Sequence, residues 1–314
     1  MNAMRFNKLK LLCSCLVTIA IASAVQAQEP QLPDLNLQEL NYAPADRTVP
    51  LSGIDTGTLF LEARLSEEAA PVDQGMVWRI FGTKPTDDGK LPLIAVAKGG
   101  GARIDLEPGS YLVHAAFGRA GATSRITIQK ETRRESLVLN AGGLRLNAVL
   151  PDGSSMRESK LTFDIYERRP NQAEDTLILP NVPAGKTIRL NAGTYHVVSK
   201  YGAVNAVTRA DLMVEAGKTT EASVEHRAAQ VTLNLVLTSN GFPLADTAWS
   251  VLTLSGDIIK EDVGAVPTMI LSAGEYTIIA KNKDRIYQRD IEVIAGRDLT
   301  IRVEAIDENE VTVQ

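Results

Sequence analysis

One short pattern occurs three times in the chain: a leucine, two residues, a glycine, one residue, a tyrosine and then an apolar run. The copies read "LEPGSYLVHAA" at 106–116, "LNAGTYHVVSK" at 190–200 and "LSAGEYTIIAK" at 271–281. Their glycines are 84 and 81 residues apart. Solenoid repeats are shorter than this, so the spacing indicates tandem globular domains.

Further landmarks recur in the same order around each copy. An aromatic residue lies upstream in an alternating segment, within "MVWRIF", "LTFDIY" and "TAWSVL". Each unit opens with an alternating segment, "TLFLEARL", "GLRLNAVL" or "QVTLNLVL", and closes with two segments joined by a polar turn. The order predicts three homologous units at 57–141, 142–228 and 229–305.

Almost every segment after residue 57 is typical of β-structure. Short runs rich in Val, Ile, Leu, Thr and Tyr alternate apolar with polar residues and are separated by Gly, Asn, Asp and Pro. A single sheet cannot bury its apolar face, so two sheets must pack together in each unit. We therefore predict an all-β chain of three tandem Ig-like or transthyretin-like sandwiches with about seven strands each. We also expect exposed connections near residues 141 and 228.

The repeated residues have a structural interpretation. The leucine ends one strand facing inward, the glycine permits a tight turn, and the tyrosine opens the next strand with its hydroxyl within reach of the backbone. The upstream aromatic residue is expected to fill the core, one sheet across from the tyrosine. The residues of this structural motif are Leu106, Gly109, Tyr111, Leu190, Gly193, Tyr195, Leu271, Gly274 and Tyr276, with Trp78, Phe163 and Trp249.

The motif and the strands that follow it, as in "LSAGEYTIIAK…RDIEVIAGRDLTIRV", resemble the end of PEGA-type and carboxypeptidase-regulatory-like domains. The resemblance covers about the last 35 residues of each unit. It implies transthyretin- or Ig-like sandwiches of the kind found in bacterial envelope proteins. Such domains are mostly structural and adhesive, so the resemblance implies no catalytic residue.

The ends of the chain have a different composition. Residues 1–27 combine a basic start, the apolar run "LLCSCLVTIAIASA" and a small-residue site ending at Ala27, which predicts a signal peptide. Residues 28–56 are expected to form a proline-containing arm and 306–314 a C-terminal tail. No later run is long enough to span a membrane as a helix, so we expect a periplasmic or secreted protein with no transmembrane segment.

Charge and cysteine content restrict the partners. Cleavage after Ala27 would remove three basic residues and both cysteines, leaving 30 basic against 38 acidic residues. A net charge of −8 argues against nucleic acid as a partner. Without cysteine, the domains must be stable through core packing alone.

Candidate catalytic and metal-binding residues are sparse. The three histidines, His114, His196 and His226, are at different places in their units and form no metal-binding motif. There is no nucleophile motif and no phosphate-binding motif. We therefore predict no catalytic, cofactor-binding or metal residues, no cofactor, and a protein that is not an enzyme.

These inferences lead to one expected function and two alternatives. We expect a non-catalytic binding or scaffolding protein of the bacterial cell envelope, with a protein or envelope polymer as partner. The first alternative is an accessory carbohydrate- or peptide-binding protein with a defined ligand pocket, which would show exposed aromatic residues. The second, a hydrolase, would need a catalytic constellation that the sequence does not contain.

Overall fold

The computed structural model describes residues 56–153, 156–168, 174–238 and 240–305. The expected signal peptide at 1–27, the arm up to residue 55 and the tail at 306–314 lie outside the described residues. No helix in the described part of the chain is long and apolar enough to cross a membrane.

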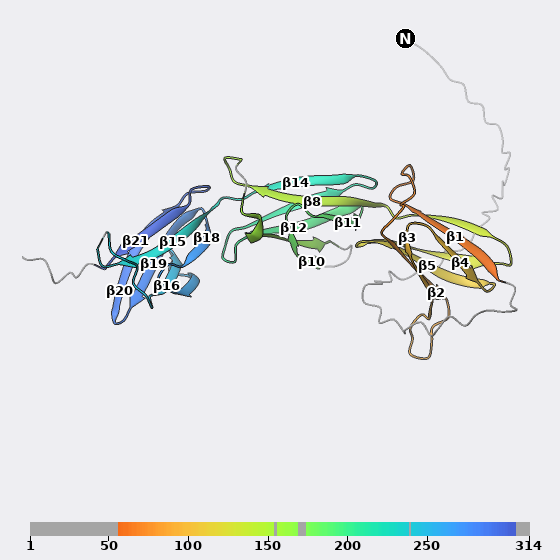
Figure 1. The fold of residues 1–314 in the computed structure, drawn as a ribbon, viewed down its shortest axis with the longest axis horizontal. Coiled ribbons are helices and arrows are strands. Elements are labelled where there is room, and N and C mark those ends of the chain that lie inside the picture. The colour runs from red at the N-terminus through yellow and green to blue at the C-terminus, as the bar shows by residue number, and fades with distance from the viewer. Residues whose placement is uncertain (1–55, 154–155, 169–173, 239, 306–314) are drawn as a thin grey trace, which may run out of the picture. The chain divides into compact units, whose positions relative to one another are not determined.

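The described residues form three sandwiches of seven strands each (Figure 1). The first contains β1 (Gly57–Arg64), β2 (Met76–Gly82), β3 (Leu93–Gly99), β4 (Ala102–Leu106), β5 (Gly109–Phe117), β6 (Ala120–Ile128) and β7 (Arg133–Val138). The second contains β8 (Ala141–Val149), a short 3-10 helix η1 (Glu158–Lys160), β9 (Leu161–Glu167), β10 (Thr176–Pro183), β11 (Thr187–Asn191), β12 (Gly193–Tyr201), β13 (Val207–Val214) and β14 (Thr219–Glu225). The third contains β15 (Ala228–Val236), β16 (Ala248–Thr253), β17 (Ile258–Val263), β18 (Thr268–Ser272), β19 (Gly274–Asn282), β20 (Arg285–Val293) and β21 (Leu299–Glu304).

Each sandwich has one three-stranded and one four-stranded sheet. The three-stranded sheets have the orders β4-β1-β7, β11-β8-β14 and β18-β15-β21. The four-stranded sheets have the orders β3-β2-β5-β6, β10-β9-β12-β13 and β17-β16-β19-β20. In every sandwich the first strand pairs antiparallel with the fourth and parallel with the seventh. The fold class predicted from the sequence is confirmed.

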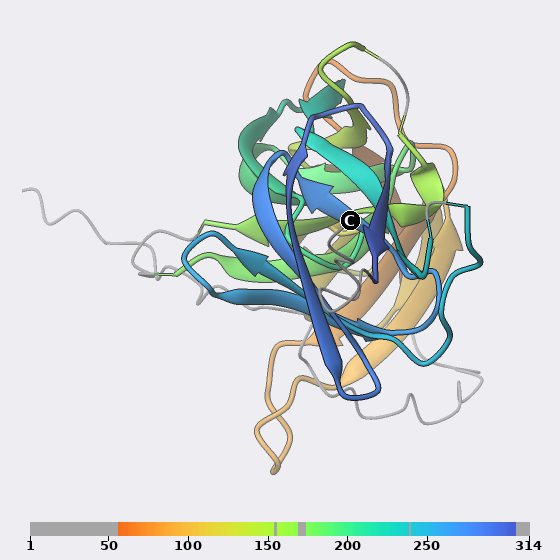
Figure 2. The same cartoon turned by 90° about the vertical axis from the view of Figure 1, so that its left-hand side faces the viewer.

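The alternating sequence pattern explains why the sheets pack in pairs. Along β1 every second residue is buried, and β15 shows nearly the same alternation. The buried residues of the two sheets form one apolar core in each sandwich, centred on Trp78, Phe163 and Trp249. The third sandwich, drawn in blue, faces the viewer in Figure 2.

Two expectations were wrong in detail. The connections near residues 141 and 228 are not exposed loops, because Leu139 and Ala141 at the first, and His226 and Ala228 at the second, are buried. Each connection has only two residues and continues the in-and-out alternation of a strand.

The core aromatic residues also do not lie one sheet across from the tyrosines. Trp78 on β2 and Tyr111 on β5 belong to neighbouring strands of the same four-stranded sheet. The second strand of each unit crosses to the other sheet after the first, and this crossing cannot be seen in the alternation pattern.

Candidate functional site

The repeated leucine, glycine and tyrosine form the same corner in each sandwich. The leucines Leu106, Leu190 and Leu271 are buried at the ends of β4, β11 and β18, and the glycines Gly109, Gly193 and Gly274 begin β5, β12 and β19. The tyrosine hydroxyl donates a hydrogen bond of 2.9 Å to the carbonyl oxygen four residues earlier in all three copies. This bond closes the turn between two strands that belong to different sheets.

Burial differs among the three tyrosines. Tyr195 and Tyr276 are buried, whereas Tyr111 is partly buried. Burial, with the nearby Glu167 carboxylate, raises the pKa of Tyr195 to about 12. Burial and the Glu107 carboxylate raise the pKa of Tyr111. Tyr111 and Tyr195 are thus neutral hydrogen-bond donors to the backbone at neutral pH.

The upstream aromatic residues lie in the cores. Trp78, Phe163 and Trp249 are almost completely inaccessible to solvent. The indole nitrogens of Trp78 and Trp249 donate to the carbonyl oxygens of Gly100 and Gly264, at 2.8 and 2.9 Å. None of these aromatic rings is available to stack on a ligand.

The first junction joins the corner of the second sandwich to the first sandwich. The Asn191 side chain accepts a hydrogen bond from the Gly121 amide at 3.2 Å and donates to the carbonyl oxygens of Gly121 and Leu139 at 3.1 and 2.8 Å. The Ala192 amide donates to the Asn140 carbonyl at 2.6 Å. One side chain of the corner therefore binds two segments of the preceding sandwich.

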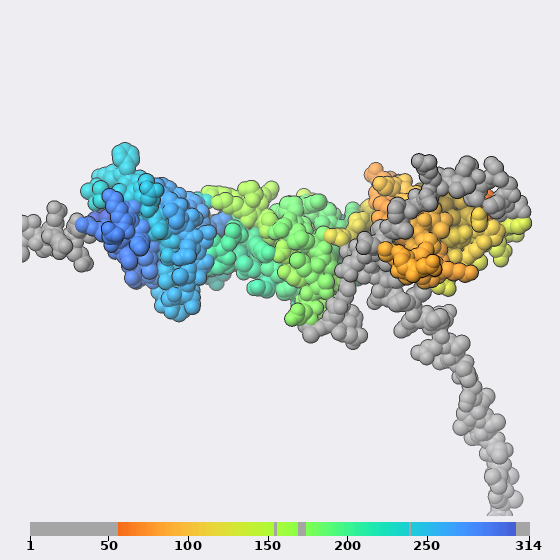
Figure 3. Space-filling view, turned by 90° about the horizontal axis from the view of Figure 1, so that it is seen from below, coloured from red at the N-terminus to blue at the C-terminus, as the bar shows by residue number. Residues whose placement is uncertain are grey.

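The second junction has the same main-chain bond with a different side chain. The Ala273 amide donates to the Arg227 carbonyl at 2.8 Å. Asn205, in the β12–β13 turn of the second sandwich, accepts from the Ser272 amide at 3.0 Å and donates to the Tyr276 hydroxyl at 2.9 Å. Asparagine thus joins the corner at both junctions, but it comes from opposite sides. In the space-filling view the surfaces of the second sandwich (green) and the third (blue) meet (Figure 3).

A polar pair is buried beside the second junction. His226 Nε2 lies 2.7 Å from Ser199 Oγ, and both residues are buried. The Tyr201 ring approaches the imidazole edge-on, with 6.1 Å between ring centroids. Burial lowers the pKa of His226, which favours the neutral imidazole. Because Ser199 is inaccessible, the pair cannot present a nucleophile to a substrate.

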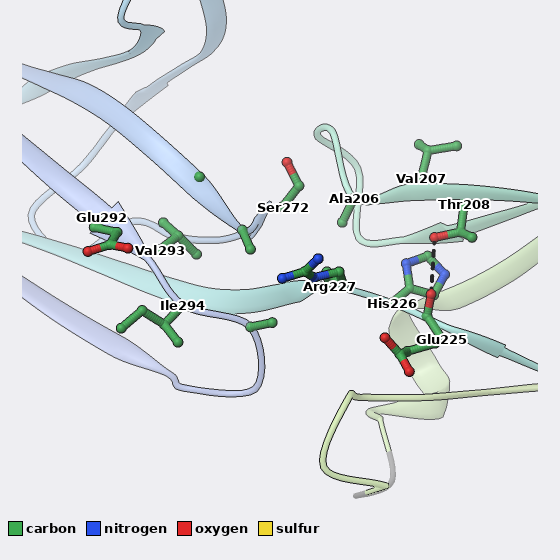
Figure 4. Close-up of a pocket in the computed structure, with 13 residues that line it drawn as sticks. Ala206, Val207, Thr208, Glu225, His226, Arg227, Ser272, Glu292, Val293 and Ile294 are labelled. Atoms are coloured by element: carbon green, nitrogen blue, oxygen red, sulfur yellow. Dashed lines mark hydrogen bonds between the residues drawn. The ribbon is translucent and has the colours of Figure 1, made fainter.

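A pocket of about 690 Å³ opens next to this pair, between the second and third sandwiches (Figure 4). Residues of both sandwiches line it: Ala206, Val207, Thr208, Glu225, His226 and Arg227 from the second and its linker, and Ser272, Ala273, Gly274, Glu292, Val293, Ile294 and Ala295 from the third. The walls combine apolar side chains, main chain and three charged residues.

Arg227 gives the pocket its chemical character. Figure 4 shows its side chain between His226 on one side and Val293 of the third sandwich on the other. Its guanidinium has no hydrogen-bond or ion-pair partner among the residues that the structure describes, and Glu225 and Glu292 do not pair with it. A free guanidinium can bind a carboxylate or phosphate through two parallel hydrogen bonds.

The other histidines lie elsewhere and serve local contacts. His114 Nδ1 is 3.1 Å from Thr123 Oγ1, and burial together with the Arg79 charge lowers its pKa to about 4. His196 Nδ1 is 2.8 Å from Asp211 Oδ1. Within the described ranges, no three His, Cys, Asp or Glu residues are grouped so that they could hold a metal ion.

Sequence reasoning missed Asn191, Asn205, Arg227 and the His226–Ser199 pair. An alignment of the units on their corners could have revealed the His226–Ser199 pair. It places these two polar residues opposite the apolar residues Leu139 and Ala115 of the first unit. No comparable signal marks Asn205, which lies in a turn that is longer than its counterpart in the first unit.

Comparison with known proteins gives one family match. Residues 230–305 match the model of the Rhizobiales growth-associated tandem repeat domain. No curated protein sequence matches the chain. The resemblance to PEGA-type domains stays a prediction.

Several solved structures share low similarity with the chain. The Bacillus anthracis TIE protein is 15% identical, with 79% of this chain and 50% of that chain covered and a TM-score of 0.24. GBS52, the minor pilin of Streptococcus agalactiae, is 15% identical, with 54% and 95% covered and a TM-score of 0.31. The streptococcal ancillary pilin is 10% identical, with 79% and 98% covered and a TM-score of 0.29. The chain therefore spans half the length of the TIE protein. Together with the sheet topology, the family match shows that this chain is built of tandem β-sandwich repeats, the third of which is similar to the Rhizobiales growth-associated domain.

Proposed function

We propose that the chain is a non-catalytic binding or scaffolding protein of the bacterial cell envelope. The observation that supports this most directly is the repeated junction. A linker of two residues, hydrogen-bonded through the corner amide at Ala192 or Ala273, gives the following sandwich little freedom to turn. Surfaces on successive sandwiches can then be presented to one partner together, which increases the effective concentration of the second contact.

Two further observations support the proposal. The family that matches residues 230–305 is described as growth-associated and tandemly repeated, which fits a role in an assembly of the envelope. The expected signal peptide, with cleavage after Ala27, would export the chain to the periplasm or beyond. The partner in this proposal is a protein or an envelope polymer.

In-cell crosslinking tests the proposal. We expect the exported protein to begin at Gln28, to fractionate with the envelope and to form a defined crosslinked adduct. Asn191→Ala with Asn205→Ala removes the junction hydrogen bonds of both asparagines and should reduce that adduct while leaving the sandwiches folded. Asn147→Ala, at an exposed position on β8, is the matched control. The proposal would be contradicted if the protein stayed in the cytoplasm with Met1 still attached, or if the double variant left the crosslinked adduct unchanged.

The pocket at the second junction supports a second candidate function, binding of an acidic carbohydrate or a peptide carboxylate. Its basis is the unpaired guanidinium of Arg227 in a pocket of about 690 Å³. Thermal unfolding with panels of acidic oligosaccharides and of peptides with a free carboxyl end tests this candidate. A ligand should raise the Tm of the wild type and not that of Arg227→Gln. Equal shifts in both proteins would rule out this pocket as the site.

A further inference from the structure

An apolar pair on the outer face of the first sandwich is buried without belonging to its core. Phe81 on β2 and Leu112 on β5 lie opposite each other in the four-stranded sheet, whose strands β2, β3 and β5 are labelled in Figure 1. Their neighbours Ile80 and Val113 face the core, so the pair faces outward. Phe81 and Leu112 nevertheless have only 2% and 4% of their surface exposed, and neither belongs to any of the three cores.

The corresponding pairs of the other two sandwiches are partly exposed. The register places Tyr166 opposite His196 in the second sandwich and Leu252 opposite Thr277 in the third. These residues follow the core aromatic residue and the corner tyrosine at the same steps as Phe81 does and Leu112 does. All four are intermediate in exposure. The repeated fold therefore does not by itself bury this position.

Residues of the neighbouring strand flank the buried pair at one edge. A Cβ placed on Gly82, next to Phe81, would lie 2.9 Å from Pro92 Cγ and 3.9 Å from Ile94 Cδ1. Ile94 itself has 45% of its surface exposed, so this edge is open to solvent. The outer face of an antiparallel sheet normally meets water, and an aromatic ring on it becomes inaccessible when another segment lies over it.

The sheet that carries the pair has charges of one sign. Strands β2, β3, β5 and β6 contain three basic residues, Arg79, Lys98 and Arg125, and no acidic residue. The register places all three on the same face as Phe81 and Leu112. The corresponding strands of the second and third sandwiches contain three and five acidic residues. This face of the first sandwich therefore suits an acidic segment with apolar side chains.

Residues 28–55 of the same chain have that composition. They contain five acidic residues and one basic residue, a net charge of −4. Their leucines are Leu32, Leu35, Leu37, Leu40 and Leu51. Opposite charges and apolar side chains on both sides make the arm complementary to the sheet.

The arm is also attached beside this sheet. A Cβ placed on Gly57, the first residue of β1, would lie 2.7 Å from Ile128 Cγ2 at the end of the edge strand β6. Eight extended residues, at roughly 3.3 Å each, reach about 26 Å, which exceeds the width of about 15 Å of a four-stranded sheet. A tether this short gives the arm a millimolar effective concentration at its own sheet, which favours it over the arm of a second copy.

We propose that residues 28–55 lie along the outer face of the β3-β2-β5-β6 sheet of their own chain and cover Phe81 and Leu112. The leucines of the arm contact the apolar pair, and its carboxylates lie near Arg79, Lys98 and Arg125. This occupant belongs to the chain itself, so its docking does not depend on the proposed binding function.

Photocrosslinking of the purified exported protein tests this docking. A photoreactive phenylalanine analogue replaces Ile94 on β3, and a second protein carries it at Ile258, which is exposed on the corresponding edge strand β17. An equal mixture of isotopically light and heavy protein separates crosslinks within one chain from crosslinks between two chains. We expect position 94 to react with a peptide within residues 28–55 of the same chain, and position 258 to give no such product.

Neutral variants of the arm test the charge complementarity. Asp34→Asn, Glu39→Gln and Asp46→Asn together remove three negative charges and should lower the crosslink yield at position 94 roughly fivefold, because each exposed ion pair contributes little. The matched control converts three exposed glutamates of the third sandwich to glutamine: Glu261, Glu275 and Glu304. Its yield should equal that of the wild type. A crosslink from position 94 to the arm of a second copy, no crosslink to residues 28–55, or equal yields in the arm and control variants would overturn the proposal.

Discussion

His226 Nε2 lies 2.7 Å from Ser199 Oγ in a buried pair at the junction between the second and third sandwiches. The first junction has Leu139 and Ala115 at the same two positions, and both are buried. The repeat therefore accepts an apolar pair in this place, and at these two positions the second junction has a titratable histidine where the first has a leucine.

This difference predicts that the second junction weakens in acid. Burial lowers the pKa of His226 from its usual value of 6.5, so the folded state favours the neutral imidazole. The contribution to stability is fully present above pH 6.5, the value in the unfolded chain, and is lost as the pH falls through the folded pKa below it. Two charged residues, Glu225 and Arg227, flank His226 in the chain, and the Tyr201 ring packs edge-on against its imidazole.

Urea unfolding at pH 7.5 and pH 5.0 measures the effect. The wild type should lose more stability between the two pH values than His226→Leu with Ser199→Ala, which copies the first junction. His114, whose pKa is lowered to about 4, titrates in both proteins and cancels in the comparison. Equal losses in the two proteins would show that His226 is not responsible.

Removing the hydroxyl from Tyr276 should cost more than removing it from Tyr111. The Tyr276 hydroxyl donates to the Ser272 carbonyl and accepts from Asn205 of the second sandwich, each at 2.9 Å. Tyr276→Phe should therefore cost about 2 kcal/mol, at about 1 kcal/mol for each buried hydrogen bond. Tyr111→Phe loses one bond at an exposed site and should cost about 1 kcal/mol or less. Equal costs in chemical denaturation would contradict the junction role of Tyr276.

Trp249→Ala should unfold the third sandwich and weaken the second. The substitution removes a buried side chain and its hydrogen bond to Gly264, at a cost of about 3–5 kcal/mol. The core of the second sandwich includes Ala228 and Ile270, which belong to strands of the third. Hydrogen exchange should rise throughout 229–305, rise moderately in β12 and stay unchanged in the first sandwich. Exchange confined to the third sandwich would show that the two cores are independent.

Trypsin should cut slowly after Arg227. The neighbouring residues His226 and Ala228 are buried, and the protease needs an extended segment released from the fold. Cleavage after Lys130, exposed in the β6–β7 turn, should precede it, as followed by mass spectrometry of timed samples. Early cleavage at Arg227 would indicate that the junction opens readily.

The local sequence determined the repeating unit. Alternating segments, turn residues and the spacing of Gly109, Gly193 and Gly274 were enough to predict three all-β sandwiches, because side-chain alternation and tight turns depend on neighbouring residues alone. The tertiary structure decided which strands share a sheet, so Trp78 lies beside the Tyr111 strand and not across from it. It also decided the junctions: Asn205 and Tyr276 are 71 residues apart in the chain, and no local pattern records that their side chains meet.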